Sequence, residues 1–167
     1  SAAAILLYCY ADDCPRGDYS VLIRNGHREP IDPSLAWKKA ASQLPSWLLA
    51  FQYGACFGVE LTVNNVLADY FHEEFDLSLV KASAIAASFG LMNLFARATG
   101  GILSDVAFRL KGVFGRVLVQ GITLIGEGVT LLVFALETRL ERAIVFLLLF
   151  SFFVQMAEGA TFALVTY

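Results

Sequence analysis

Arg97 lies far from either end of an apolar stretch that runs from Leu79 to Val106, where a charged side chain is costly. Eight residues separate it from Asp105, about 12 Å along a helix, so the guanidinium can extend only part of the way to the end of the stretch. Its neighbours on the same helical face are small or polar: Gly90, Asn93 and Gly101. Ionisable groups in such places usually face a cavity or a partner. The spacing therefore predicts a cavity-lining face, with a structural ion pair to another helix as the alternative.

Three carboxyl groups also fall inside apolar stretches, at Glu60, Glu127 and Glu158. Each belongs to a polar face: Tyr53, Phe57 and Asn64 accompany Glu60; Gln120, Thr123 and Thr130 accompany Glu127; Gln155 and Gly159 accompany Glu158. A buried carboxyl group can exchange a proton near neutral pH, which a buried arginine cannot do. All three are therefore candidate proton carriers. The alternative for Glu127 or Glu158 is that one of them is the structural counter-charge of Arg97.

A third group of polar residues lies where one apolar stretch ends and the next begins. Gly101 and Asp105 form a Gly-x-x-x-Asp pattern, and Arg109 and Arg116 follow in a short connection. The glycine permits close helix packing, and the carboxylate can pair with either arginine or with a helix N-terminus. This arrangement predicts a gating motif.

Other patterns have simpler interpretations. Gly54 and Gly58 form a GxxxG step, which predicts a helix-packing surface. The three cysteines fit neither a zinc site nor a redox pair: Cys9, Cys14 and Cys56. His72 and Glu73 begin an HExxH pattern that lacks its second histidine. We therefore expect no metal, no cofactor and no enzymatic activity.

The elements that hold these residues follow from the composition. Of the 167 residues, 57% are apolar and only 16% carry a charge, and the mean hydropathy is +0.64. A soluble domain of this size needs a more polar exterior. The net charge of −3 also argues against nucleic-acid binding. The sequence thus predicts an all-α, polytopic membrane protein.

Four stretches approach the roughly 20 residues that a membrane helix requires: Trp47 to Tyr70, Leu79 to Val106, Val113 to Leu136 and Ala143 to Val165. Residues 1–10 are apolar but too short to span, so we expect them to be the end of another span and the chain to be a fragment. Residues 11–46 are expected to form a polar loop before the spans of residues 47–167. The lysines and arginines place this loop and the connection at Arg109 in the cytoplasm.

The surroundings of Asp105 resemble the cytoplasmic loop motif of the major facilitator superfamily. Several segments resemble the nitrate/nitrite porter family, in particular the high-affinity nitrate transporters of algae, plants and fungi: DDCPRGDY (Asp12 to Tyr19), YGACFGVELTVNNVLADYF (Tyr53 to Phe71), FGLMNLFARATGGILSD (Phe89 to Asp105) and EGATFAL (Glu158 to Leu164). The resemblance implies a partial major facilitator fold, mostly its C-terminal half. Residues 1–10 would end the sixth helix, residues 11–46 would form the central cytoplasmic loop, and residues 47–167 would form helices seven to ten.

The resemblance also implies a secondary active transporter of nitrate, with nitrite as a further substrate, coupled to protons and working by alternating access. Arg97 would grip nitrate and Tyr53 and Phe57 would line the same site, while Asn93 would add a neutral donor. The implied partners are the lipid bilayer, here the plasma membrane, and an accessory membrane subunit. Where the family is expected to have proline, this chain has Ala98 and Thr166. The alternatives are a major facilitator transporter of another small anion, such as an organic acid, and a non-transporting membrane subunit.

Overall fold

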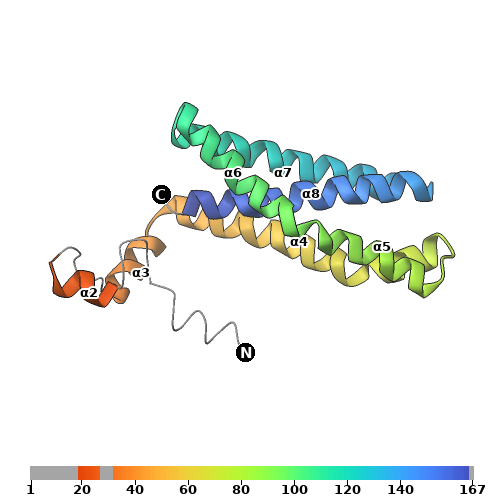
Figure 1. Ribbon diagram of the computed structural model, residues 1–167, viewed down its shortest axis with the longest axis horizontal. Coiled ribbons are helices and arrows are strands. Elements are labelled where there is room, and N and C mark those ends of the chain that lie inside the picture. Colours follow the sequence, from red (N-terminus) through yellow and green to blue (C-terminus); the bar gives the residue numbers. More distant parts are fainter. Residues whose placement is uncertain (1–18, 27–31, 166–167) are drawn as a thin grey trace. The chain divides into compact units, whose positions relative to one another are not determined.

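The computed structural model describes residues 19–26 and 32–165, and every regular element within these ranges is an α-helix (Figure 1). The prediction of an all-α fold is confirmed. The chain divides into two compact units, residues 1–46 and Trp47–Tyr167. The predicted end of a span at residues 1–10 lies outside the described residues, as do Cys9, Cys14, the DDCPRGD part of the DDCPRGDY segment and Thr166.

Two short helices lie within the region that the sequence predicted to be a loop. They are α2 (Tyr19–Arg24) and α3 (Pro33–Ala41). Proline suits the first turn of a helix, where its missing N–H has no partner to lose. The Asp32 side chain caps α3 by accepting a hydrogen bond of 2.8 Å from the amide of Ser34, and hydrogen bonding to Ser34 lowers the pKa of the Asp32 carboxyl group. The expected polar loop thus contains a short helix that begins at Pro33.

The second unit consists of long helices. They are α4 (Leu44–Glu74, which begins in the first unit), α5 (Leu79–Leu91), α6 (Asn93–Lys111), α7 (Val113–Leu136) and α8 (Leu140–Val165). By length and composition, three segments can cross a membrane: Leu79–Lys111, Val113–Leu136 and Leu140–Val165. α4 has 31 residues but is not among them, so its crossing stays a prediction. Since α4 continues to Glu74 and α6 to Lys111, the connections are shorter than the sequence predicted.

The predicted span from Leu79 to Val106 is not one continuous helix. α5 ends at Leu91 and α6 begins at Asn93, with Met92 between them. The amides of Phe95 and Ala96 both bond to the Met92 carbonyl, at 3.3 and 3.0 Å, so the regular ladder of hydrogen bonds restarts there. The sequence pattern contained no proline to mark this break.

α7 has the reverse polarity of a helix in a soluble protein. Its buried face carries Gln120, Thr123, Glu127 and Thr130, which is the polar face that the sequence predicted. Large apolar side chains on its other side are exposed, among them Ile125 and Leu132, at 69% and 66%. Exposed apolar side chains around a polar interior are what a lipid environment favours.

α8, the blue helix of Figure 1, contacts α5, α6 and α7. Its approach to α6 is so close that a Cβ atom at Gly100 would overlap the backbone of Met156, and one at Gly159 would overlap the carbonyl of Arg97. Gly54 and Gly58 of α4 have nothing within 4 Å of a Cβ position. Within the described part of the chain, the close approach between helices is therefore made by other glycines than those of the GxxxG step, whose role in packing stays a prediction.

We expect Gly100→Ala to lower the thermal unfolding midpoint of the protein in detergent, measured by intrinsic fluorescence. The added methyl group would push α6 away from α8, and overpacking of this kind costs about 1–3 kcal/mol. Gly121→Ala in α7 is the matched control, because a Cβ there meets nothing within 4 Å and alanine favours the helix. Equal midpoints for the two variants would contradict the close contact.

Candidate functional site

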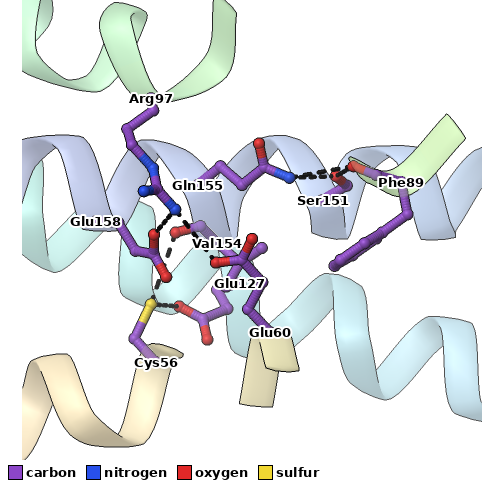
Figure 2. A network of polar contacts seen from close by, with 9 residues as sticks. All are labelled: Cys56, Glu60, Phe89, Arg97, Glu127, Ser151, Val154, Gln155 and Glu158. Atoms are coloured by element: carbon purple, nitrogen blue, oxygen red, sulfur yellow. Dashed lines mark hydrogen bonds and ion pairs between the residues drawn. The ribbon is translucent and has the colours of Figure 1, made fainter. Parts of the chain in front are cut away.

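Arg97 of α6 is held by two carboxyl groups from different helices, as Figure 2 shows. Its Nη2 atom donates a hydrogen bond to Glu158 Oε2 on α8 and lies 3.4 Å from Glu60 Oε2 on α4. The side chain of Glu158 is 0% exposed and that of Arg97 is 32% exposed. The structural ion pair that the sequence analysis gave as the alternative is therefore present in the structure. The Arg97 side chain nevertheless stays partly accessible.

The charges at this site do not balance. One guanidinium carries one positive charge, and the two carboxylates that contact it carry two negative charges when both are ionised. Arg97 Nε and Glu158 Oε1 are buried and have no hydrogen-bond partner among the described residues. The cluster therefore has unused hydrogen-bonding capacity and an excess of negative charge unless it binds a proton.

Aromatic rings lie beside the charged cluster. Tyr53 and Phe57 stack with their centroids 5.6 Å apart and their planes 8° from parallel, and Phe162 meets Tyr53 edge-on at 5.5 Å. Phe162 lies one helical turn after Glu158, and Phe57 lies one turn before Glu60. The structure thus brings Tyr53, Phe57 and Arg97 into one region. The sequence analysis missed Phe162, although it lies one helical turn after Glu158.

Two other predicted positions do not join this region. Asn93, one turn before Arg97, is exposed at the start of α6, and Asn64 is exposed on α4. Both residues share a helical face with charged groups in the sequence pattern, but helical spacing alone does not determine which part of that face a neighbouring helix covers.

Glu127 is separated from Arg97 by its own contact. The Cys56 thiol lies 3.1 Å from Glu127 Oε2 and 3.6 Å from the Val154 carbonyl (Figure 2). Both side chains border a cavity of ≈ 390 Å³ between α4 and α7 that Arg97 does not line. Of the two acids considered as the counter-charge of Arg97, Glu158 is the one in contact. Cys56, to which the sequence analysis assigned no role, is the hydrogen-bond partner of a buried acid.

Two of the four predicted gating residues, Asp105 and Arg116, are in contact beside the turn between α6 and α7. Arg116 pairs with Asp105 at 2.9 Å, contacts Ser104 Oγ at 3.5 Å and lies 4.7 Å from the centroid of the Phe108 ring. Gly112 alone joins the two helices, with a φ of 61° that favours glycine. Asp105 therefore pairs with Arg116, whereas Arg109 is exposed in the last turn of α6. Gly101 faces the Gly159 carbonyl of α8.

Within residues 19–26 and 32–165, no three His, Cys, Asp or Glu side chains are arranged to hold a metal ion. The residues at Arg97 themselves can bind an anion through the guanidinium and exchange protons through the carboxyl groups.

Comparison with known proteins finds relatives along the whole chain. The high affinity nitrate transporter 2.5 of Arabidopsis thaliana is 41% identical over 167 residues, which are 100% of this chain and 33% of that protein. Nitrate transporter 2.2 of Chlamydomonas reinhardtii is 43% identical over 120 residues, 71% of this chain and 23% of its own length. The nitrate/nitrite transporter NrtP of Picosynechococcus is 38% identical over 119 residues, 71% of this chain and 22% of its own. No family model and no solved structure matches the chain.

The relatives agree with the prediction that the chain is a multi-pass membrane protein and not an enzyme, because they are named as transporters. The chain spans about a third of the length of the Arabidopsis relative that it matches from end to end, at 33%.

We expect Cys56→Ala to destabilise the protein more than Cys56→Ser does. Serine keeps a donor for Glu127, whereas alanine leaves a buried carboxyl group without its partner, at a cost of about 1–3 kcal/mol. The measurement is the thermal unfolding midpoint in detergent of the two variants and the parent. A lower midpoint for serine than for alanine would contradict the proposed contact between Cys56 and Glu127.

Proposed function

Since the chain belongs to the nitrate/nitrite porter family of the major facilitator superfamily, we propose that the complete protein containing it is a secondary active transporter of nitrate. The helices α4, α5 with α6, α7 and α8 are then the seventh to tenth of that protein, and residues 11–46 belong to its central cytoplasmic loop. The observation that carries the proposal is the partly exposed side chain of Arg97 beside the stacked rings of Tyr53 and Phe57.

The chemistry of this site suits a small planar anion. Nitrate is flat and carries one negative charge, and a guanidinium can donate two parallel hydrogen bonds to two of its oxygens. An aromatic ring can pack on its plane. Arg97 is the anion-binding residue of this proposal, and Tyr53 and Phe57 form the apolar wall. Nitrite carries the same charge as nitrate and is also planar. Asn93 is exposed in this structure, so it can act as a neutral donor to the anion only if it moves toward the site.

In this proposal nitrate competes with the carboxylates of Glu60 and Glu158 for the Arg97 guanidinium, and this competition couples nitrate binding to proton binding. With Glu60 and Glu158 ionised, the cluster carries a net negative charge and repels an anion. When a carboxyl group takes up a proton, it loses its negative charge and attracts the Arg97 guanidinium less strongly. The guanidinium can then turn toward nitrate. Nitrate and protons therefore bind together, and we assign Glu158 as the first proton carrier, because it is the fully buried contact of Arg97.

Alternating access requires an element that closes one side of the membrane. The ion pair of Asp105 with Arg116 lies at the end of α6 that the lysines and arginines assign to the cytoplasm. We assign this pair to the cytoplasmic gate, and the plasma membrane as the location of the protein.

We expect Arg97→Lys to abolish most of the nitrate-induced current of the complete protein in oocytes, because an ammonium group cannot make the parallel pair of hydrogen bonds. The measurement is current against nitrate concentration, with surface expression quantified and with and without an accessory membrane subunit. Lys81→Arg, at an exposed position of α5, is the control for a change between the two cations. An undiminished current in Arg97→Lys would remove Arg97 from the site.

We expect Glu158→Gln to uncouple transport from protons. The neutral amide imitates the protonated acid, so the half-saturating nitrate concentration should lose its dependence on pH, and uphill accumulation should fail while nitrate exchange across the membrane persists. The measurement is nitrate uptake and counterflow in vesicles at several pH values. Glu127→Gln is the comparison: if it uncouples transport and Glu158→Gln does not, Glu127 is the carrier and our assignment is wrong.

A parent protein that reaches the surface but shows no nitrate current, with or without an accessory subunit, would contradict nitrate as the substrate. The anion-binding chemistry at Arg97 would then favour a transporter of another small anion.

A further inference from the structure

The break between α5 and α6 is held by two side chains of α8. Ser151 Oγ donates a hydrogen bond of 2.8 Å to the Phe89 carbonyl, and Gln155 Nε2 donates one of 3.1 Å to the same oxygen (Figure 2). Gln155 Nε2 also lies 3.0 Å from Ser151 Oγ. All three residues are buried, with exposures of 0% for Ser151 and Gln155 and 1% for Phe89. We call Ser151 and Gln155 the α8 clamp.

The Phe89 carbonyl is available to the α8 clamp because it belongs to the last turn of α5, where the break removes the amide donor that a continuing helix would supply. In an apolar interior such a group must find a partner or lose several kcal/mol. The α8 clamp supplies two donors from one helical turn, since residues four apart lie on the same face. The break is thus stabilised from outside its own segment.

The two halves of the broken span are attached to α8 in different ways. α6 touches α8 through backbone at Gly100 and Gly159, where no side chain separates the helices. α5 is attached through side chains, namely the α8 clamp and the stacking of Phe89 on Phe150 with centroids 5.7 Å apart. The direction of α5 relative to α6 therefore depends on hydrogen bonds that can exchange, whereas the position of α6 depends on backbone shape.

The α8 clamp is also connected to the charged cluster. Gln155 and Glu158 lie three residues apart on α8, and Glu158 contacts Arg97, which lies one turn beyond the break. One face of α8 thus holds the Phe89 carbonyl, in the last turn before the break, and the Arg97 guanidinium after it (Figure 2). Gln155 Oε1 has no partner among the described residues, so its amide serves here as a donor.

We propose that Ser151 and Gln155 are positioning residues for the anion site. By fixing the Phe89 carbonyl they set the angle at the break between α5 and α6, and with it the direction in which the guanidinium of Arg97 faces the site. This role rests on the proposed function of Arg97 in nitrate binding, while the effect on the angle of the break is independent of the substrate.

The first test is transport by the complete protein with Ser151→Ala, Gln155→Leu and both changes together. Misplacing the guanidinium should raise the half-saturating nitrate concentration about fivefold or more in the double variant, while the maximal current per transporter at the surface changes little. The matched control is Gln120→Leu: Gln120 is also a buried glutamine that donates to α8, through Thr161 Oγ1 at 3.0 Å, but it does not contact the break. Loss of current in proportion to surface expression alone, or an equal rise in Gln120→Leu, would overturn the proposal.

The second test measures the angle directly and needs no substrate. Spin labels are attached at Val80 on α5 and Leu110 on α6, which are 81% and 78% exposed, in a background without other reactive cysteines. Removing the α8 clamp should shift or broaden the distance distribution between the labels, and Gln120→Leu should not. An unchanged distribution overturns the proposal even if nitrate transport is established, whereas a changed distribution in a protein without nitrate current supports the clamp and counts against the proposed function.

Discussion

A guanidinium in an apolar interior must have opposite charge within reach, and this requirement organises the second unit of the chain. Arg97 on α6 takes its counter-charges from α4 and α8, so three helices must converge on one point. The convergence depends on glycine, because the backbones of α6 and α8 touch at Gly100 and Gly159. The same contact excludes larger side chains next to the arginine and leaves part of its surface accessible. Packing and charge are therefore parts of one arrangement.

The lipid environment explains why the polar residues are inside. With apolar side chains favoured on the outer surface, the interior of the unit can hold glutamines, threonines and acids, provided that each finds a partner. Thr161 is the partner of two such side chains, since its hydroxyl group accepts hydrogen bonds from Gln52 on α4 and Gln120 on α7, at 3.2 and 3.0 Å. Such junctions connect the helices alongside the apolar core cluster, which includes Phe71, Phe89 and Phe150.

Much of this arrangement could be predicted from the sequence, and the remainder depends on contacts between distant residues. The apolar stretches gave the helices of the second unit, and helical spacing gave the buried face of α7 and the positions of Arg97 and Glu158. The break at Met92 was missed, because its stabilisation comes from Ser151 and Gln155 about 60 residues later. The pairing of Cys56 with Glu127 was missed for the same reason. The sequence also left open whether Asp105 pairs with Arg109 or with Arg116. Local pattern also did not predict the short helix that begins at Pro33 within the expected loop.

The pairing of Arg97 with its acids has an electrical consequence. Moving one elementary charge through the membrane potential involves about 2.3 kcal/mol for each 100 mV. When Glu60 and Glu158 are both ionised, which is the unloaded state in the proposed function, the cluster around Arg97 carries one net negative charge, so a rearrangement that carries it through the field as a unit does electrical work. In the proposed transporter, the membrane voltage therefore acts on the reorientation of the unloaded protein as well as on the ions that bind.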